Sequence, residues 1–185
     1  MPLAHAILGF LDYEPMTGYD LKKIFDQSVA HFWSATQSHI YKALENLEAD
    51  GFVESKIIPQ EGRPNRKEYH ITKKGRAELR QWVSTPLPLS QTREAWLIQI
   101  FFAHNNSNEE IAALLKARAE EIRQVLEAFR TQIPSSMEEG AAKPDMTRMQ
   151  QLWQITADYG AAYYEAELVW IEKTLQKVNK LPPLK

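Results

Sequence analysis

The stretch from Ser34 to Gly51 constrains the fold more than any other part of the chain, because it predicts a short helix with two different faces. Its apolar side chains recur at the three- and four-residue intervals of one helical stripe. This stripe consists of Ile40, Ala43, Leu44 and Leu47. Ser34 is expected to cap the first turn, and Asp50 with Gly51 to end the helix. One face is therefore expected to pack in a core, while the other stays polar.

The polar face carries small and donor-rich side chains in its first two turns, the part of a recognition helix that reaches base edges in the DNA major groove. The candidate DNA-contact residues of this helix are Gln37, Ser38, His39, Tyr41 and Lys42. Glu45 lies on the same face one turn further along and would be repelled by phosphates, so only the first two turns are expected to enter a groove. A polar outward face is also ordinary for a surface helix. The residues around this helix must therefore show whether it binds DNA.

A basic hairpin is expected directly after this helix. Phe52 to Ile58 has the composition of a strand, and alternating apolar and polar residues up to Ile71 indicate a second strand. The candidate DNA contacts of this hairpin are Arg63, Arg66 and Lys67. A solvated loop that happens to be charged is the alternative interpretation. A basic hairpin beside a two-faced helix favours a winged helix-turn-helix, whose wing contacts the DNA backbone or the minor groove.

The charge of the whole chain does not indicate a uniformly basic nucleic-acid-binding protein, since its formal net charge is −2 at pH 7. The segment from Lys56 to Arg80, however, holds eight Lys and Arg residues against three Glu residues, a local excess of five positive charges. A DNA-binding surface is therefore expected to be local, and this segment lies just after the two-faced helix.

Two domains are expected, with the boundary at the prolines of Ser84 to Pro88. The first, residues 1–85, is predicted to bind DNA and to contain two short helices before the two-faced helix and a further helix from Thr72. The second, residues 86–185, is expected to be helical throughout. The predicted fold class is mainly α: a winged helix-turn-helix with a two-stranded wing, followed by a helical dimerisation domain.

Three helices are expected in the second domain. Trp96 to Ala103 is apolar nearly all round, so it is expected to be buried on every side. Ser107 and Glu110 have the spacing of a capping box and predict the start of a long second helix. A polar connection from Pro134 to Pro144 is expected before the last helix.

The last helix, about Thr147 to Asn179, carries two apolar registers at the spacing of a coiled-coil seam. A helix with two apolar faces needs two packing partners, so one face is expected to meet a second subunit and form a homodimer. The candidate dimerisation residues are Trp170, Ile171, Leu175 and Val178. A monomeric antiparallel bundle is the alternative.

Aromatic side chains recur in the second domain, where they indicate either core packing or a site for a small aromatic effector. The candidate residues of such an effector pocket are Trp96, Trp153, Tyr159 and Tyr163. Aromatic residues at helical spacing form a core more often than a ligand site, so both interpretations stay open.

Several classes of function are not supported by the sequence. The chain has no cysteine, its histidines lack metal-ligand spacing, and it has neither a phosphate-binding glycine loop nor a nucleophile elbow. No metal, cofactor or enzymatic activity is therefore expected. No run approaches the ~20 apolar residues of a membrane span. The absence of cysteine fits a reducing compartment, so a cytoplasmic protein without membrane contact is expected.

Three segments together resemble the PadR family of bacterial transcriptional regulators: LAHAILGFLDYEPMTGYDLKKIF, SHIYKALENLEADGFVES and QEGRPNRKEYHITKKGRAEL. They cover nearly all of residues 3–80, and the second half of the chain is similar to the larger helical domain of the virulence-activator-like branch. The resemblance implies a homodimer that binds an inverted repeat in double-stranded DNA. The contacts that it implies are, in the helix, Ser38, Tyr41 and Lys42 and, in the wing, Arg63, Arg66 and Lys67.

The function expected from these observations is a sequence-specific transcriptional regulator, a repressor more than an activator, with release from DNA by an aromatic small molecule as a further expectation. Two other classes stay open. A winged helix used only for protein interactions would have an uncharged wing and an apolar outer helix face. A helical small-molecule-binding protein would use the aromatic residues without specific DNA binding. The basic wing and the polar helix face favour the regulator.

Overall fold

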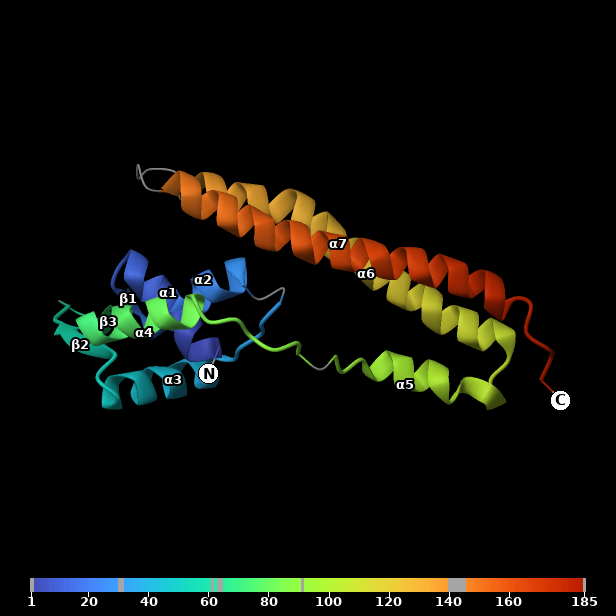
Figure 1. The fold of residues 1–185 in the computed structure, drawn as a ribbon, viewed down its shortest axis with the longest axis horizontal. Helices are drawn as coiled ribbons and strands as arrows, with labels where there is room; N and C mark the ends of the chain where they lie inside the picture. The colour runs from blue at the N-terminus through green and yellow to red at the C-terminus, as the bar shows by residue number, and fades with distance from the viewer. Residues whose placement is uncertain are drawn as a thin grey trace. The chain divides into compact units, whose positions relative to one another are not determined.

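The computed structural model describes residues 2–29, 32–60, 62, 65–90, 92–139 and 146–184, with only the backbone of residues 130–139 and 146–147. The chain divides into two compact units, Met1–Leu89 and Ser90–Lys185 (Figure 1). The first unit contains α1 (Pro2–Tyr13), β1 (Met16–Thr17), α2 (Gly18–Ser28), α3 (Gln37–Ala49), β2 (Val53–Ile58), β3 (Arg66–Ile71) and α4 (Lys73–Val83). The second contains α5 (Ala95–Phe101), the short 3-10 helix η1 (Ala103–Asn105), α6 (Asn108–Glu139) and α7 (Met146–Val178).

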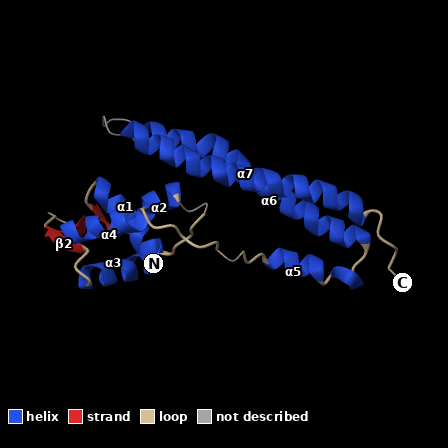
Figure 2. Cartoon of the chain, in the orientation of Figure 1, coloured by secondary structure: helices blue, strands red, loops and turns tan. Residues whose placement is uncertain are grey.

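A small antiparallel sheet in the order β1-β3-β2 forms the wing and joins it to the helices (Figure 2). Val53 of β2 lies opposite Ile71 of β3 at the buried end of the hairpin, and Met16 of β1 lies opposite Tyr69. The predicted two-stranded wing is therefore present, with a third strand beside it. The sequence did not predict β1, because two residues are too few to show the alternation that marks a strand.

The core of the first unit lies where α1, α2 and α3 meet the inner ends of the strands. The predicted apolar stripe of α3 is buried in it: Ile40, Ala43, Leu44 and Leu47. Full burial of one such aliphatic side chain contributes roughly 1.5–3 kcal/mol of transfer free energy. The stripe thus holds α3 by one face and leaves the other face to solvent, which confirms the predicted winged helix-turn-helix.

The first turn of α3 is capped by Thr36 and not by Ser34. The side-chain oxygen of Thr36 accepts a 3.3 Å hydrogen bond from the backbone N–H of His39, and Thr36 has the extended backbone of an N-cap residue. The expected cap was therefore wrong by two residues, because Ser and Thr are both good caps and composition does not choose between them. At the other end Asp50 caps the helix and Gly51 has a φ of +73°, which confirms the predicted end.

The second unit is built on α6 and α7, which pack against each other along their length (Figure 1). Its buried core consists of Ala103, Ile111, Ala112, Leu115, Ala119, Ile122, Leu126, Ile171 and Val178. Two predicted dimerisation residues, Ile171 and Val178, are thus core residues of their own unit, and Leu175 is partly buried against the same core. The expectation that Ile171 and Val178 face a second subunit is corrected, because both are buried in the core of their own unit, whereas for Leu175 it remains a prediction. Trp170 remains 42% exposed.

The first helix of this unit also differs from the expectation. No residue of α5 is buried, and Ile98 and Phe101 are 61% and 79% exposed. The prediction of burial on every side was wrong for the single chain. An apolar composition indicates that the side chains of a helix are buried against a packing partner. It does not indicate whether that partner belongs to the same chain or to another one.

The last correction concerns the predicted connection from Pro134 to Pro144. Helix α6 continues through Pro134 as far as Glu139, and residues 140–145 lie outside the described part of the chain. A proline fixes φ near its helical value and removes one amide donor, so it weakens a helix without always ending it.

Candidate nucleic-acid interface

Helices α2 and α3 form the helix-turn-helix, and the ring of Tyr41 on α3 packs directly over Gly18 at the start of α2. A Cβ atom added to Gly18 would lie 2.6 Å from Cε1 of Tyr41, well inside van der Waals contact. Only glycine lets the tyrosine ring lie this near the start of α2. Tyr41 is nevertheless 40% exposed, so its ring packs against α2 while part of the residue remains accessible.

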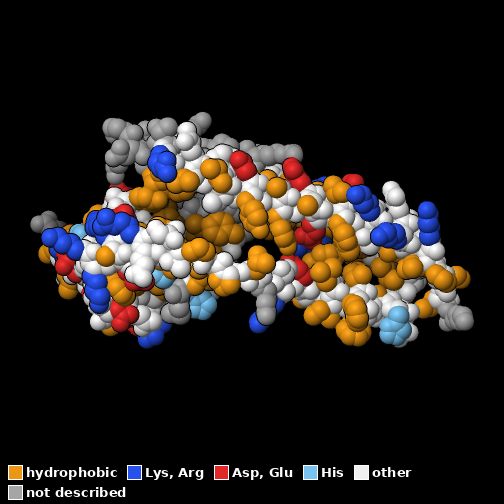
Figure 3. All heavy atoms as spheres, in the orientation of Figure 1, with side chains coloured by type: hydrophobic (Ala, Val, Ile, Leu, Met, Phe, Trp, Pro, Cys, Tyr) orange, Lys and Arg blue, Asp and Glu red, His pale blue; other side chains and the backbone are white. Residues whose placement is uncertain are grey.

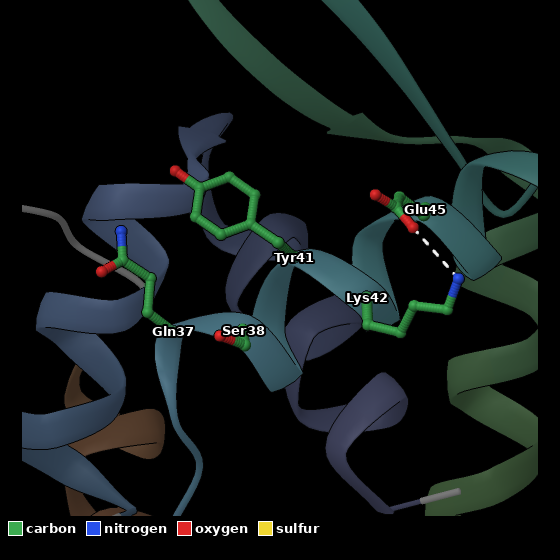
Figure 4. A pocket seen from close by; sticks show the side chains of 5 residues that line it. All are labelled: Gln37, Ser38, Tyr41, Lys42 and Glu45. Carbon is green, nitrogen blue, oxygen red and sulfur yellow. Dashed lines mark hydrogen bonds and ion pairs between the residues drawn. The ribbon is translucent and has the colours of Figure 1, made fainter.

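A shallow hollow lies on the exposed face of α3, lined by Gln37, Ser38, Tyr41, Lys42 and Glu45 (Figure 4). Four of the five predicted helix contacts line this hollow, and the fifth, His39, is exposed as well. Their exposure follows from burial of the opposite stripe. The first turns of α3 thus present amide, hydroxyl, phenol and ammonium groups, which suit base edges and phosphates.

Lys42 has a carboxylate partner on its own helix. Its Nζ donates a 3.2 Å hydrogen bond to Oε2 of Glu45, three residues further along, and the two side chains are 72% and 66% exposed. An exposed pair of this kind contributes roughly 0–1 kcal/mol to stability, so it orients the ammonium group without locking it.

The wing is joined to α2 by Arg66, whose Nη2 donates a 2.7 Å hydrogen bond to Oδ2 of Asp20. The same carboxylate accepts hydrogen bonds from the backbone N–H and the hydroxyl of Thr17, which completes a capping box at the start of α2. Partial burial alone would raise the pKa of Asp20, but the hydrogen bonds from Thr17 and the nearby Arg66 outweigh it and hold the pKa below its usual value.

A second ion pair joins the wing to α3. Nζ of Lys67 donates a 2.9 Å hydrogen bond to Oε2 of Glu48, and the hydroxyl of Ser55 on β2 donates to the other carboxylate oxygen. The hydrogen bond from Ser55 and then that from Lys67 lower the pKa of Glu48. The hydrogen bond to Glu48 in turn raises the pKa of Lys67. Both groups therefore stay charged at neutral pH.

Three of the four predicted interface cations are described, and each of them is paired with a carboxylate in the free protein: Lys42, Arg66 and Lys67. The fourth, Arg63, lies outside the described residues. A phosphate would have to replace or share these carboxylates. Sequence reasoning missed the partners of the wing cations because they lie 46 and 19 residues away along the chain, where no local periodicity connects them.

In the second unit, Glu94 joins two of the predicted effector residues. Nε1 of Trp96 donates a 3.0 Å hydrogen bond to one oxygen of Glu94, and the hydroxyl of Tyr163 donates a 3.1 Å bond to the other. Burial, followed by the hydrogen bond to Glu94, raises the pKa of Tyr163 to about 12. The Tyr163 hydroxyl therefore remains a protonated donor at neutral pH.

A partly buried ion pair between Arg118 and Glu167 lies against this group. Arg118 binds both carboxylate oxygens of Glu167 at 2.8 and 3.3 Å, lies 3.9 Å from Glu94, and has its guanidinium carbon 5.3 Å from the centre of the Trp96 ring. The two remaining effector candidates are not part of this group. Trp153 precedes Tyr163 by ten residues on α7, about 15 Å along the helix axis. Tyr159 is 70% exposed.

Large apolar side chains remain on the surface of the second unit (Figure 3). On and next to α5 and along one side of α7, those at least 41% exposed are Leu97, Ile98, Phe101, Phe102, Leu152, Ile155, Tyr159, Tyr163, Val169 and Trp170. In the described part of the chain, no helix combines the length and apolar character of a membrane span. Within the same residues, no group of three His, Cys, Asp or Glu side chains is placed to hold a metal ion.

An exposed polar recognition helix beside a basic antiparallel wing defines a winged-helix DNA-binding fold. Residues 7–81 match the family described as transcriptional regulator PadR-like, and residues 92–179 match the one described as virulence activator alpha C-term. The chain belongs to the PadR-like family of transcriptional regulators, which confirms the resemblance seen in the sequence. The members of this family are regulators and not enzymes.

Two curated relatives are similar over part of their length. A probable transcriptional regulator of Mycobacterium tuberculosis is 42% identical over 87 residues, 47% of this chain and 46% of that protein. The negative transcriptional regulator PadR of Bacillus subtilis is 31% identical over 115 residues, 62% of this chain and 63% of that protein. The matched segments thus span less than two thirds of either relative.

Solved structures share the fold. The crystal structure of Bacillus subtilis PadR in complex with operator DNA is 24% identical and superposes with a TM-score of 0.80, covering 96% of this chain and 99% of that chain. The same protein has been solved with p-coumaric acid, at 23% identity and a TM-score of 0.71, covering 96% of this chain and 95% of that one.

Proposed function

We propose that this chain is a sequence-specific transcriptional regulator that binds an inverted-repeat operator as a homodimer. The observation that carries the proposal is the exposed face of α3, where four predicted contact residues line one hollow. The wing cations Arg66 and Lys67 start β3 beside the helix-turn-helix, at the position from which a wing reaches the DNA backbone. In this proposal residues 1–85 bind DNA and residues 86–185 hold the dimer together.

The homodimer is supported by the exposed apolar side chains of the second unit. Monomeric proteins rarely leave large contiguous apolar patches in water, and α5 and α7 expose residues as large as Phe101 and Trp170. A second copy of the chain would cover these side chains. Two recognition helices related by a twofold axis would then read two half-sites in opposite orientation, which is why the operator is expected to be an inverted repeat.

Repression is the direction of control that we propose, because a relative 31% identical is described as a negative transcriptional regulator. We also propose that a planar aromatic molecule binds near Trp96 and Tyr163, with the Arg118 guanidinium beside it. Bacillus subtilis PadR has been solved with such a molecule, p-coumaric acid. Binding would release DNA if the ligand favours a different spacing of the two DNA-binding domains.

The test of DNA binding is a genome-wide footprint of the protein, followed by titration of the recovered segments with purified protein. Recovered sites should share an inverted repeat, and two subunits should bind each site. Sites without a shared sequence, or binding no tighter than to a scrambled duplex, would contradict the proposal and favour a winged helix used for protein interactions.

The effector is tested separately with a panel of aromatic acids that includes p-coumaric acid. Tryptophan fluorescence and operator affinity should change together for at least one compound, and the Tyr163→Phe variant should weaken that response. If fluorescence and operator affinity stay constant across the panel, Trp96 and Tyr163 have a structural role alone.

A further inference from the structure

The carboxylate of Glu45 lies on the exposed face of α3 that carries the proposed DNA contacts. It lines the same hollow as Ser38 and Lys42, and it is hydrogen-bonded to Lys42 at 3.2 Å in the free protein (Figure 4). Residues three apart on a helix face the same side and are displaced by about 4.5 Å along its axis. Whenever Lys42 reaches into a groove, Glu45 is therefore carried there with it.

A carboxylate between two phosphate backbones is unfavourable unless it meets hydrogen-bond donors. In the major groove the donors are the amino groups N4 of cytosine and N6 of adenine. In a G·C pair, N4 of cytosine is hydrogen-bonded to O6 of guanine, so donor and acceptor lie about 2.9 Å apart. That separation resembles the 3.2 Å between Nζ of Lys42 and the carboxylate oxygen of Glu45.

We propose that Glu45 is a specificity-determining residue, and that Lys42 and Glu45 together recognise the major-groove edge of one base pair. Lys42 donates to O6 and N7 of guanine, while Glu45 accepts from N4 of the paired cytosine. This inference rests on the proposed DNA-binding function and adds a residue and a base pair to it. It also replaces the expectation that Glu45 stays outside the groove.

The arrangement predicts which base pairs are accepted. At the centre of its major-groove edge a G·C pair presents the acceptor O6 of guanine to Lys42 and the donor N4 of cytosine to Glu45. A T·A pair presents the acceptor O4 and the donor N6 in the same order, but it lacks the guanine N7 on the Lys42 side. Reversal to C·G or A·T places the cytosine or adenine amino group against the Lys42 ammonium group and the oxygen against Glu45. G·C should therefore bind best, T·A next, and the two reversed pairs worst.

The experiment compares wild type with Lys42→Ala, Glu45→Ala and the double variant. Each is titrated against operators in which every half-site position carries each of the four base pairs in turn. The matched control is Glu120→Ala, which removes an exposed carboxylate from another i,i+3 pair, with Arg123 at 3.3 Å, in the helical unit. Circular dichroism and urea unfolding verify that all variants are folded.

At one symmetric position, Glu45→Ala should reduce the preference for G·C over C·G by about tenfold, within the range of a good base contact. Lys42→Ala should relax the same position, and the double variant should lose less than the product of the two single losses, because the two side chains act on one base pair. Glu120→Ala should leave the preferences unchanged.

Three results would overturn the inference. Glu45→Ala could tighten binding to all sequences alike, which would show a carboxylate that only repels phosphates. Its effect could fall at a different position from that of Lys42→Ala, or the two effects could multiply independently. In each case wild-type protein would still bind its operator specifically and the proposed function would stand. Wild-type protein without sequence preference would contradict the proposed function itself.

Discussion

Arg66 of β3 donates a hydrogen bond of 2.7 Å to the carboxylate of Asp20, the residue that completes the capping box at the start of α2. One carboxylate thus holds both the wing and the first turn of a helix of the helix-turn-helix. The two side chains are 44% and 40% exposed, so the pair contributes at most about 1 kcal/mol to stability. This contact between the wing and α2 is therefore weak enough for a DNA phosphate to replace Asp20 as the partner of Arg66.

The first prediction separates the wing from the helix. Arg66→Ala should weaken binding to all sequences by nearly the same factor, because a wing cation neutralises phosphates and carries little sequence information. Each phosphate contact contributes about 0.9 to the slope of log affinity against log salt, so loss of one from each subunit of a dimer should lower the slope by roughly two. Lys42→Ala should instead relax one symmetric operator position.

The measurement is a titration of operator and scrambled DNA at four or five salt concentrations. An unchanged salt slope for Arg66→Ala would show that Arg66 remains with Asp20 in the complex. Arg66 would then position the wing, and the phosphate contacts would have to come from other residues.

The second prediction concerns the folding stability at acidic pH. Asp20 and Glu48 both have pKa values below their usual 3.8 and 4.5, so their ion pairs contribute stability above these pH values and lose it as pH falls through the lowered pKa values in the folded state. The Glu48→Gln variant should be less stable than wild type at pH 7, and this difference should shrink below about pH 4.

Urea unfolding between pH 3 and pH 7 measures this difference. The Glu120→Gln variant serves as control, because it removes the same charge from an exposed ion pair with Arg123 in the helical unit. A stability difference for Glu48→Gln that is constant across the range would show that its pairing with Lys67 and Ser55 does not depend on charge.

The sequence was sufficient to predict α3, its buried stripe and its donor-rich face, because all three follow from the period of one helix. It could not predict which partner holds Arg66 or Lys67, since Asp20 and Glu48 become neighbours only when the sheet packs on the helices. The start of α3 was predicted to within one turn, but the predicted N-cap was Ser34 and the observed one is Thr36. Which of the two caps the helix depends on the backbone conformation at these residues.

The same reason explains the correction in α7. Trp170 and Ile171 are adjacent and both apolar, and each belongs to a register with coiled-coil spacing. Nothing local decides which register faces α6. In the folded unit Ile171 is fully buried in the core that α7 forms with α6, and Trp170 is 42% exposed.

The third prediction concerns Gly75, which packs against the backbone of Phe52 without room for a side chain. A Cβ atom on Gly75 would lie 2.2 Å from the carbonyl oxygen of Phe52, which also accepts a hydrogen bond from the backbone N–H of Thr72. Gly75→Ala should therefore push α4 away from the hairpin and destabilise the first unit by about 1–3 kcal/mol.

The matched control is Gly9→Ala in α1, where an added Cβ meets no atom within 4 Å. Alanine in a helix is favoured over glycine by up to ~1 kcal/mol, so this variant should be neutral or more stable. Thermal unfolding compares the two variants with wild type. Equal stability of both would show that the start of α4 can shift without cost.

The fourth prediction uses the neighbours Trp170 and Ile171 to separate dimerisation from folding. Ile171→Ala opens a cavity within a single unit and should cost about 2–5 kcal/mol of unfolding free energy, while the protein remains dimeric under conditions where it is folded. Trp170→Glu places a charge on the apolar surface expected to meet the second copy, so it should yield a folded monomer.

Sedimentation velocity at micromolar concentration and urea unfolding measure both properties for each variant. Trp170 also packs edge-on against Trp96, with ring centroids 5.5 Å apart, so Trp170→Glu alone could act through α5. Leu152→Glu, at a residue that is 50% exposed on α7, repeats the test away from that contact. Both Glu variants should be monomeric and lose operator affinity together, because two half-sites then no longer act as one site. A monomeric wild type, or dimers that survive both substitutions, would show that the exposed faces of α5 and α7 are not the interface.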